Sequence, residues 1–431
     1  MKLLDKLGAI WSGVGYPFLI HKGDELRFSE IANQSLIDLS DVHKGDVVAI
    51  IGDFNPSSIL ALLRLIDIGV VVVPLTVETR HEHEYFFESA LVDVVIDGTQ
   101  VRRRSHNKKH EFIEKLRTLE HAGLVLFSTG TTGRPKAILH DLTLFLKRFE
   151  TPRPTLRTIT FLLFDHIGGI NTLLHTLFNK GVVIAPDYRT VDSILETCRK
   201  YTVEVLPTTP TFLRMMLMSG AVPSKVPACL KVITYGTERM DQPTLDELCK
   251  LLPNVDIRQT FGMSELGIVR IKSESRDSLY MKVGGEGVET RVVEGVLQIR
   301  SSSRMLGYLN APTPFDAEGW YDTKDVVEVK DQYYKVTGRI SDVINVGGFK
   351  FMASEVERVA LEFRNVSLVK ATPKQNPITG QHVELLVQPT TEDAVDKAAL
   401  MDFLKERLQQ HMVPKRIRIE YVSIGHRFKK S

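Results

Sequence analysis

Blocks of apolar residues alternate with polar, turn-forming residues along the first half of the chain. In residues 46–74, a run of β-branched residues leads through a turn to an apolar segment of helical length. Gly69 separates this segment from a second apolar run that ends at Pro74. This order is typical of a β–α–β unit whose strands are buried on both faces. Further apolar runs of strand length occur at 91–97, 124–127, 181–185, 203–207 and 231–236. Strands that alternate with helices predict the α/β class, with mostly parallel sheets flanked by helices.

After about residue 285 the pattern changes to short runs separated by turns. Segments such as GVLQIRS, DVVEVKDQYYKVTG and SLVKATP are typical of short strands. A predicted helix at about 396–410 and a strand near 416–422 follow them. We place the main boundary at Gly338-Arg339. The sequence therefore predicts a large N-terminal domain at 1–337 and a small α+β C-terminal domain at 338–431.

Composition and charge narrow the class of protein. The 431 residues are 43% hydrophobic and 25% charged, as expected for a folded chain with more than one domain. The formal net charge of +2 gives no electrostatic reason to expect nucleic acid as the main partner. Residues 101–112 are locally basic, and we interpret them as a solvated surface loop rather than a binding patch.

The cysteines and apolar runs bear on the compartment. Cys198, Cys229 and Cys249 form no CxxC pair, which argues against a disulfide framework or a zinc site and favours a reducing compartment. No apolar run is long enough to cross a bilayer, so we expect no membrane insertion. The first twenty residues lack a signal-peptide cleavage pattern. We therefore expect a cytoplasmic protein.

A loop suited to phosphate follows the strand predicted at 124–127. Residues 128–136 read STGTTGRPK. Glycines let backbone N–H groups approach a phosphate closely, hydroxyl groups donate hydrogen bonds, and a lysine neutralises charge. The loop does not satisfy the Walker A pattern GxxxxGK[ST]. Its candidate contacts are Ser128, Thr129, Gly130, Thr131, Thr132, Gly133 and Lys136.

This loop and four further motifs occur in the order typical of the adenylate-forming (AMP-binding) superfamily, which includes acyl-CoA synthetases, adenylation domains and luciferases. The loop resembles the superfamily's phosphate loop. Residues 261–265 (FGMSE) resemble its aromatic-Gly-x-Thr-Glu motif, and 319–325 (GWYDTKD) its Gly-Trp…Thr-Gly-Asp motif. Residues 338–342 (GRISD) and 347–350 (GGFK) resemble its hinge region. The resemblance covers nearly the whole chain and implies a mobile small domain that rotates about 339–342.

The resemblance also implies how a nucleotide would be held. Glu265 would bind Mg²⁺, and Ser264 would contact the α-phosphate. Phe261 would lie against adenine, where an aromatic face suits a flat base. Asp325 would accept hydrogen bonds from the ribose hydroxyls, and Arg339 would reach the ribose or a phosphate. The nucleotide contacts implied in addition are Gly236, Thr237, Glu238 and Gly262.

Further side chains have an implied role in catalysis, at the acyl pocket or in binding CoA. Lys430 would approach the carboxylate and α-phosphate, with Lys429 as the alternative, because the Gly-Lys pair that the family usually carries at this end is missing. Thr131 and Lys136 of the loop are further catalytic candidates. His166, within Phe-Asp-His-Ile-Gly-Gly, would line or gate the acyl pocket. Lys350 would pair with a CoA phosphate.

The function implied is that of an acid–thiol ligase of the acyl-CoA synthetase type. A small-molecule carboxylic acid would react with ATP, in the presence of Mg²⁺, to give an acyl-adenylate and pyrophosphate. The acyl group would then pass to CoA or to phosphopantetheine. Two alternatives stay open: an acid or amino-acid adenylation domain that loads an acyl carrier protein, favoured for amino acids by Asp165 alone, and a nucleotide-binding homologue with impaired catalysis. The identity of the acid and a homodimeric state are open as well.

Overall fold

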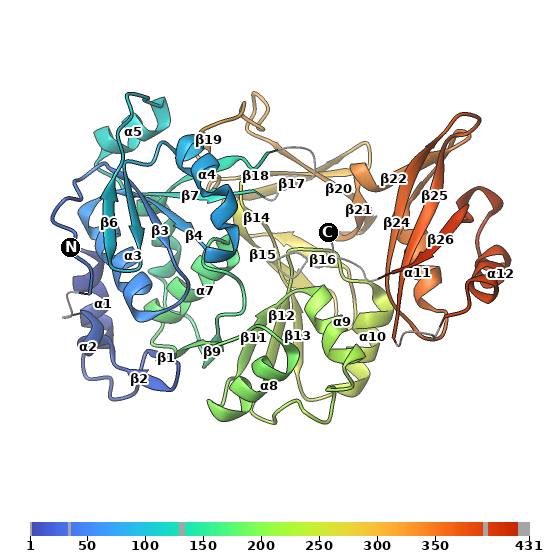
Figure 1. Ribbon diagram of the computed structural model, residues 1–431, viewed down its shortest axis with the longest axis horizontal. Helices are drawn as coiled ribbons and strands as arrows, with labels where there is room; N and C mark the ends of the chain where they lie inside the picture. Colours follow the sequence, from blue (N-terminus) through green and yellow to red (C-terminus); the bar gives the residue numbers. More distant parts are fainter. Residues whose placement is uncertain (1, 33–35, 129–133, 391–394, 421–431) are drawn as a thin grey trace.

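The computed structural model describes residues 2–32, 36–128, 134–390 and 395–420. The strands of these residues form four sheets. Figure 1 shows three sheets together in a large body and the fourth in a small lobe at one end. The predicted α/β class, with a large N-terminal domain and a small C-terminal one, is confirmed.

Sheet I gathers strands from the first 141 residues and one strand from far downstream, in the order β19-β8-β7-β4-β3-β5-β6. The pairs among β3, β4, β5 and β7 are parallel, whereas β6, β8 and β19 pair antiparallel with their neighbours. The bounds are β3 (Val47–Ile51), β4 (Val71–Leu75), β5 (Val94–Asp97), β6 (Gln100–Arg103), β7 (Gly123–Phe127), β8 (Ala137–Asp141) and β19 (Gly307–Tyr308).

The predicted unit at 46–74 is strand β3, helix α3 (Pro56–Ile68) and strand β4. The Asn55 side chain accepts a hydrogen bond from the Ser58 N–H at 2.9 Å and so begins α3, with Pro56 in its first turn. Gly69, with φ 84°, ends the helix in the left-handed conformation. Alternate residues of β3 belong to two different hydrophobic clusters, so the strand is buried on both faces as predicted.

Further helices surround the N-terminal strands. They are α1 (Leu3–Trp11), α2 (Phe28–Ala32), α4 (His83–Ala90), α5 (Glu111–Leu119), α6 (Leu142–Leu146) and α7 (Ile167–Phe178). Short 3₁₀ turns lie at Val77–Glu82 and Lys147–Phe149. In the part of the chain that the structure describes, none of the helices combines the length and the apolar character that a membrane crossing requires.

Sheet II has the order β13-β12-β11-β9-β10-β1-β2 and is parallel except for the β1–β2 pair. Its strands are β1 (Leu19–His21), β2 (Asp24–Leu26), β9 (Thr158–Ile159), β10 (Val183–Ala185), β11 (Val205–Thr208), β12 (Val232–Tyr235) and β13 (Asp256–Gln259). The connections from β10 to β11, β11 to β12 and β12 to β13 contain α8 (Val191–Lys200), α9 (Pro210–Met218) and α10 (Gln242–Leu251), whose apolar faces share one core with the sheet.

Sheet III is antiparallel in each recorded pair and has the order β14-β15-β16-β21-β20-β18-β17. Its strands are β14 (Phe261–Met263), β15 (Gly267–Ser273), β16 (Met281–Gly284), β17 (Val288–Val293), β18 (Val296–Ser301), β20 (Tyr321–Lys330) and β21 (Tyr333–Arg339). The change of pattern predicted after about 285 therefore belongs to a sheet that begins earlier, at Phe261.

The small domain has its own sheet, sheet IV, and its own hydrophobic core, which includes Ile344 and Ile417. Its elements are β22 (Val343–Val346), β23 (Phe349–Met352), α11 (Ala353–Leu361), β24 (Val366–Asn376), β25 (Gly380–Pro389), α12 (Lys397–Arg407) and β26 (Arg416–Ile419), with 3₁₀ turns at Ile340–Asp342 and Gln410–Met412. The helix and the strand predicted near the end of the chain correspond to α12 and β26. The boundary at 337/338 and the hinge at 339–342 stay predictions.

Two arginines of the large domain contact the small domain. Arg214, on α9, donates a hydrogen bond to the Ser367 carbonyl at 3.2 Å. Arg239, which precedes α10, has Nη2 3.6 Å from Oε2 of Glu357 on α11. Both pairs join the side of sheet II that carries α9 and α10 to the small domain, which lies beside these helices in Figure 1.

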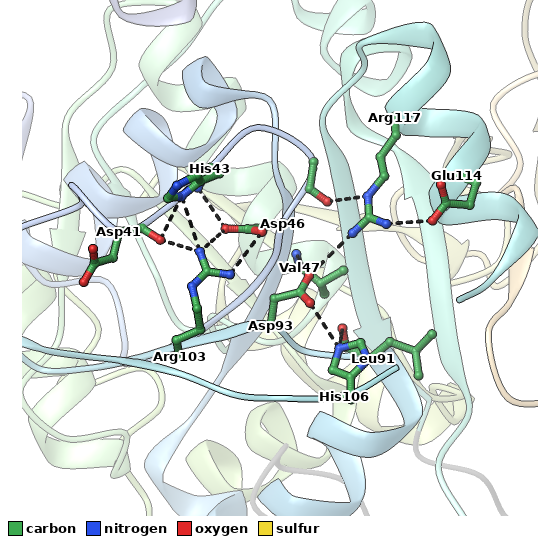
Figure 2. Close-up of polar contacts among 11 residues, drawn as sticks. Asp41, His43, Asp46, Val47, Leu91, Asp93, Arg103, His106, Glu114 and Arg117 are labelled. Atoms are coloured by element: carbon green, nitrogen blue, oxygen red, sulfur yellow. Dashed lines mark hydrogen bonds and ion pairs between the residues drawn. The ribbon is translucent and has the colours of Figure 1, made fainter. Parts of the chain in front are cut away.

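Three basic side chains of the stretch at 101–112, those of Arg103, Arg104 and His106, contact carboxylates; Figure 2 shows Arg103 and His106. Residues 101–103 belong to β6 rather than to a loop. Arg103 Nη2 lies 2.8 Å from Asp46 Oδ2, and His106 Nε2 lies 3.1 Å from Asp93 Oδ1. The other oxygen of Asp93 accepts the Val47 N–H at 2.8 Å. These contacts tie the β5–β6 hairpin to the start of β3.

Candidate active site

The predicted phosphate loop is the connection of the antiparallel β7–β8 hairpin. Phe127 pairs with Ala137, and the ends of the loop bond to each other. The Ser128 N–H donates to the Lys136 carbonyl at 3.1 Å, and the Lys136 N–H donates to Ser128 Oγ at 3.1 Å. The middle of the loop, with Thr129, Gly130, Thr131, Thr132 and Gly133, lies outside the described residues.

Two side chains outside the sequence motifs, those of Tyr85 and Asn310, hold the second arm of the loop, residues 134–136. The Tyr85 hydroxyl donates to the Pro135 carbonyl at 2.8 Å, and the Arg134 guanidinium lies 5.3 Å from the centre of the Tyr85 ring. Asn310 also donates to the Pro135 carbonyl, at 3.1 Å, while its Oδ1 accepts the Ala137 N–H at 2.9 Å. Residues from α4 and from the segment after β19 thus fix the end of the loop that carries Lys136.

Tyr308 connects Lys136 with Glu265. The Lys136 Nζ lies 4.9 Å from the centre of the Tyr308 ring, and the Tyr308 hydroxyl donates to Glu265 Oε1 at 2.8 Å. The backbone of Glu265 is held as well, because its carbonyl accepts the Met305 N–H at 2.8 Å. The structure therefore brings together the lysine of the phosphate loop and the predicted metal ligand, which are far apart in the sequence.

Glu265 is suited to a magnesium ion that arrives with a nucleotide. The described residues contain no group of three or more His, Cys, Asp or Glu side chains that could form a metal site. Mg²⁺ usually retains several waters and is bound through one or two carboxylates together with substrate phosphates, so a single carboxylate beside a phosphate loop is sufficient. The residues present fit the predicted role of Glu265.

A buried histidine supports the residue before Glu265. His140, on β8, donates from Nε2 to the Ser264 carbonyl at 2.6 Å. Burial lowers the pKa of His140 to about 4, so the ring is neutral at pH 7. His140 lies in none of the sequence motifs. Of the other residues in this motif, Phe261 lies half-buried on β14, opposite Val269, and Gly262 is exposed.

Asp325 and Arg339 face each other across β20 and β21. Asp325 is 6% exposed, and Arg339 Nε donates to its Oδ1 at 3.3 Å. Burial raises the pKa of Asp325 to about 6, and Arg339 offsets this only partly. The Arg339 side chain is itself 50% exposed, so its charge is largely screened by water. The two side chains that the resemblance places at the ribose thus lie beside each other.

Gly236, Thr237 and Glu238 form the turn at the carboxyl end of β12. A side chain at Gly236 would collide with Thr260, whose carbonyl oxygen would lie 2.8 Å from the added Cβ. Thr237 has φ 71°, a conformation unusual for a residue with a branched side chain. Glu238 Oε1 accepts the Thr211 N–H at 2.7 Å, so this carboxylate supports the beginning of α9. Ligands of parallel α/β sheets bind at such strand ends.

His166 begins helix α7. Its Nδ1 accepts the Gly168 N–H at 3.0 Å, which is a capping contact. Glycine is required at position 169 for steric reasons, because a side chain there would collide with the Leu163 carbonyl. Asp165, beside His166, is buried. The structure thus shows a helix cap at His166, and its predicted role at an acyl pocket stays a prediction.

The structure does not join the remaining candidates to this group. Lys350 is exposed on β23, opposite Asn345, and has no contact with the residues around Glu265 in the described part of the chain. Lys429 and Lys430 lie outside the described residues.

The fold and this arrangement of residues define the adenylate-forming superfamily. The chain belongs to the AMP-binding enzyme family, whose model matches residues 27–309. It is 24% identical to acyl-CoA synthetase FUM10 of Gibberella moniliformis (strain M3125 / FGSC 7600), over 68% of this chain and 62% of that protein. It is 22% identical to 2-succinylbenzoate–CoA ligase of Staphylococcus epidermidis (strain ATCC 35984), over 82% of this chain and 74% of that protein. The match to FUM10 spans only about three fifths of that relative's length.

Solved structures agree on the fold. The anthranilate CoA ligase AuaEII in complex with anthranoyl-AMP has a TM-score of 0.82 at 17% identity, and the match covers 100% of this chain and 95% of that one. ATP-bound MatB from Rhodopseudomonas palustris has a TM-score of 0.79 at 19% identity, with 99% and 97% covered. Both matches include the small C-terminal domain.

Proposed function

We propose that this protein activates a carboxylic acid with ATP and Mg²⁺ to an acyl-adenylate, and then transfers the acyl group to the thiol of CoA. The observation that carries the proposal is the meeting of Lys136 and Glu265 at Tyr308, beside the end of the phosphate loop. A polyphosphate substrate requires a positive side chain that neutralises phosphate, here Lys136, close to a carboxylate that binds its Mg²⁺, here Glu265. The names of the relatives, which are CoA ligases, support the choice of acceptor.

Each described candidate has a role in this proposal. Lys136 neutralises charge on the phosphates, and Glu265 binds Mg²⁺, which when bound supplies much of the charge neutralisation that pyrophosphate release needs. Asp325 accepts hydrogen bonds from the ribose hydroxyls, because its carboxylate has more acceptor sites than the one that Arg339 uses. Arg339 lies beside it, at the hinge.

The small domain completes the cycle in the proposal. Lys430, or Lys429, approaches the carboxylate and the α-phosphate during adenylation. Rotation about 339–342 then brings the exposed Lys350 towards the phosphates of CoA. A hinge needs only a few residues that can absorb a change in backbone angles.

An exchange assay across a panel of acids tests the proposal. Purified protein is incubated with ATP, Mg²⁺, labelled pyrophosphate and one acid at a time: fatty, aryl, dicarboxylic or amino acids. The expected result is exchange that depends on one class of acid, with AMP release that requires CoA. Exchange without any response to CoA favours a carrier protein as acceptor. ATP binding without exchange for any acid contradicts the proposal and favours a homologue with impaired catalysis.

Two further parts of the proposal need their own measurements. A homodimer is tested by light scattering of the purified protein, where a single species at monomer mass contradicts it. A cytoplasmic location is tested by fractionation of the source cells, where recovery outside the cytoplasmic fraction contradicts it.

A further inference from the structure

Tyr308 lies between the two charged side chains on which the proposed reaction depends. Its side chain is 5% exposed, its hydroxyl donates to Glu265 Oε1 at 2.8 Å, and its ring lies 4.9 Å from the Lys136 Nζ. Its backbone is fixed by the pairing of β19 with β8, in which Tyr308 lies opposite Ile138. β8 begins at Ala137, directly after Lys136, so the strand that holds Tyr308 also carries Lys136 at its start.

The two contacts of Tyr308 differ in kind. The ring face attracts the ammonium group of Lys136 electrostatically. The hydroxyl donates to one oxygen of Glu265 and leaves the other oxygen, and further lone pairs, for a cation. Within the described residues no direct ion pair joins Lys136 to Glu265. A direct ion pair between them would compete with both ligands. The lysine would neutralise the glutamate in place of a phosphate, and the glutamate would neutralise the lysine in place of a metal ion.

The direction of the contact with Glu265 follows from its chemistry. A carboxylate oxygen accepts hydrogen bonds, and the Tyr308 hydroxyl is the donor at 2.8 Å.

We propose that Tyr308 is a positioning residue for the magnesium–nucleotide complex: it keeps Lys136 and Glu265 from pairing with each other and directs both towards one nucleotide. The inference rests on the proposed function and extends it to a residue outside the superfamily motifs found in the sequence. Tyr308 acts through Glu265 and Lys136 and touches no reacting atom in this account.

Tyr308→Phe tests the role of the hydroxyl, because it keeps the ring over Lys136 and removes only the donor to Glu265. Binding of ATP is measured by calorimetry at graded Mg²⁺ concentrations, without any acid. The Mg²⁺ concentration that gives half-maximal ATP affinity is expected to rise about tenfold, the usual effect of losing a group that orients a metal ligand. In the exchange assay the KM for the acid is expected to stay unchanged.

Tyr280→Phe is the matched control. Tyr280 is a half-buried tyrosine whose hydroxyl donates to Glu328 of β20 at 3.0 Å. The hydrogen bond from Tyr280 to Glu328 joins the same kinds of group as the one from Tyr308 to Glu265, but it lies outside the candidate site. Its variant is expected to show the Mg²⁺ dependence of the unmodified protein.

A double-mutant cycle with Glu265→Gln separates positioning from a general structural role. If Tyr308 acts through Glu265, Tyr308→Phe changes the Mg²⁺ dependence less than about twofold in the Glu265→Gln background. A full tenfold change in that background, or none in either background, overturns the proposal. So does a Tyr308→Phe protein that is unfolded at the assay temperature, because the hydroxyl then serves the fold. Since binding is measured without acid, failure of the acid-activation proposal appears separately, as exchange that no acid supports.

Discussion

At the scale of single residues, two buried groups beside the candidate site make opposite contributions to the pH dependence of stability. The pKa of Asp325 is raised to about 6 by burial, so the folded state holds its proton to higher pH than the unfolded state, and stability is lost as pH rises from about 4 through 6. The pKa of His140 is lowered to about 4 by burial, so stability is lost as pH falls from about 6.5 towards 4. At pH 7, His140 is neutral as its site requires, whereas Asp325 is a buried charge with one partly screened partner.

Asp325→Asn is therefore expected to stabilise the ligand-free protein at pH 7.5 and to weaken its binding of ATP. The gain is up to about 3 kcal/mol, the value of a pKa displaced from 3.8 to about 6, and it should vanish near pH 4. Urea unfolding of the large domain at the two pH values, followed by circular dichroism, measures the difference. An equal effect of the substitution at both pH values would show that burial of the charge is not its cause.

At the scale of secondary-structure elements, the sequence predicts strands best where they are apolar and local. The run at 47–51 coincides with β3, and the helix predicted at about 396–410 contains α12. β19 has two residues and no periodicity to detect, and the antiparallel β8 follows the phosphate loop without a helix between. Sequence patterns that assume alternating strands and helices do not indicate this hairpin.

The residues of the candidate site also fall into those that the sequence indicates and those that it does not. Motif residues such as Glu265 and Asp325 could be predicted because the family carries them in a fixed order. Tyr308 and Asn310 could not, since their contacts depend on the folded chain: Asn310 bonds to Tyr85 across 225 residues. The roles of these supporting residues come from packing between distant segments, which no local spacing indicates.

The end of β12 gives a prediction at this scale. Gly236→Ala places a Cβ against Thr260, where backbone lies close on the neighbouring segment, so the turn at 236–238 must shift. We expect a loss of about 1–3 kcal/mol in the free energy of unfolding and weaker ATP binding. Thermal unfolding and calorimetry measure the two effects.

Gly284→Ala is the control for that substitution. Gly284 lies on β16, and an added Cβ there meets no atom within 4 Å. Its effect on ATP binding should be negligible. If both variants behave alike, the close approach of Thr260 is not what requires glycine at position 236.

At the scale of the whole molecule, the small domain is docked on sheet II by a few polar contacts. The Arg239–Glu357 pair and the bond from Arg214 to the Ser367 carbonyl join two domains that have separate hydrophobic cores. Interfaces of this kind permit relative motion of domains. Arg239 directly follows the turn at 236–238, so docking of the small domain and the candidate nucleotide site share one short segment.

Arg239→Gln is expected to loosen this docking. Hydrogen exchange of the proposed hinge, residues 339–342, should become about two- to fivefold faster, as the loss of one partly exposed ion pair implies. Mass spectrometry of exchanged peptides measures the rate. Lys225→Gln, which breaks an exposed pair with Asp192 inside the large domain, should leave the rate unchanged. Equal rates in the unmodified and Arg239→Gln proteins would show that this pair does not restrain the hinge.

The late position of β19 in the chain has a consequence for biosynthesis. The phosphate loop emerges from the ribosome well before Tyr308 and Asn310. Asn310 holds the second arm of the loop, and Tyr308 holds Glu265. A growing polypeptide that stops short of these residues contains the loop but lacks its supports. Because a ligand stabilises only a conformation that can bind it, ATP is expected to assist folding only after β19 has been made and has paired with β8.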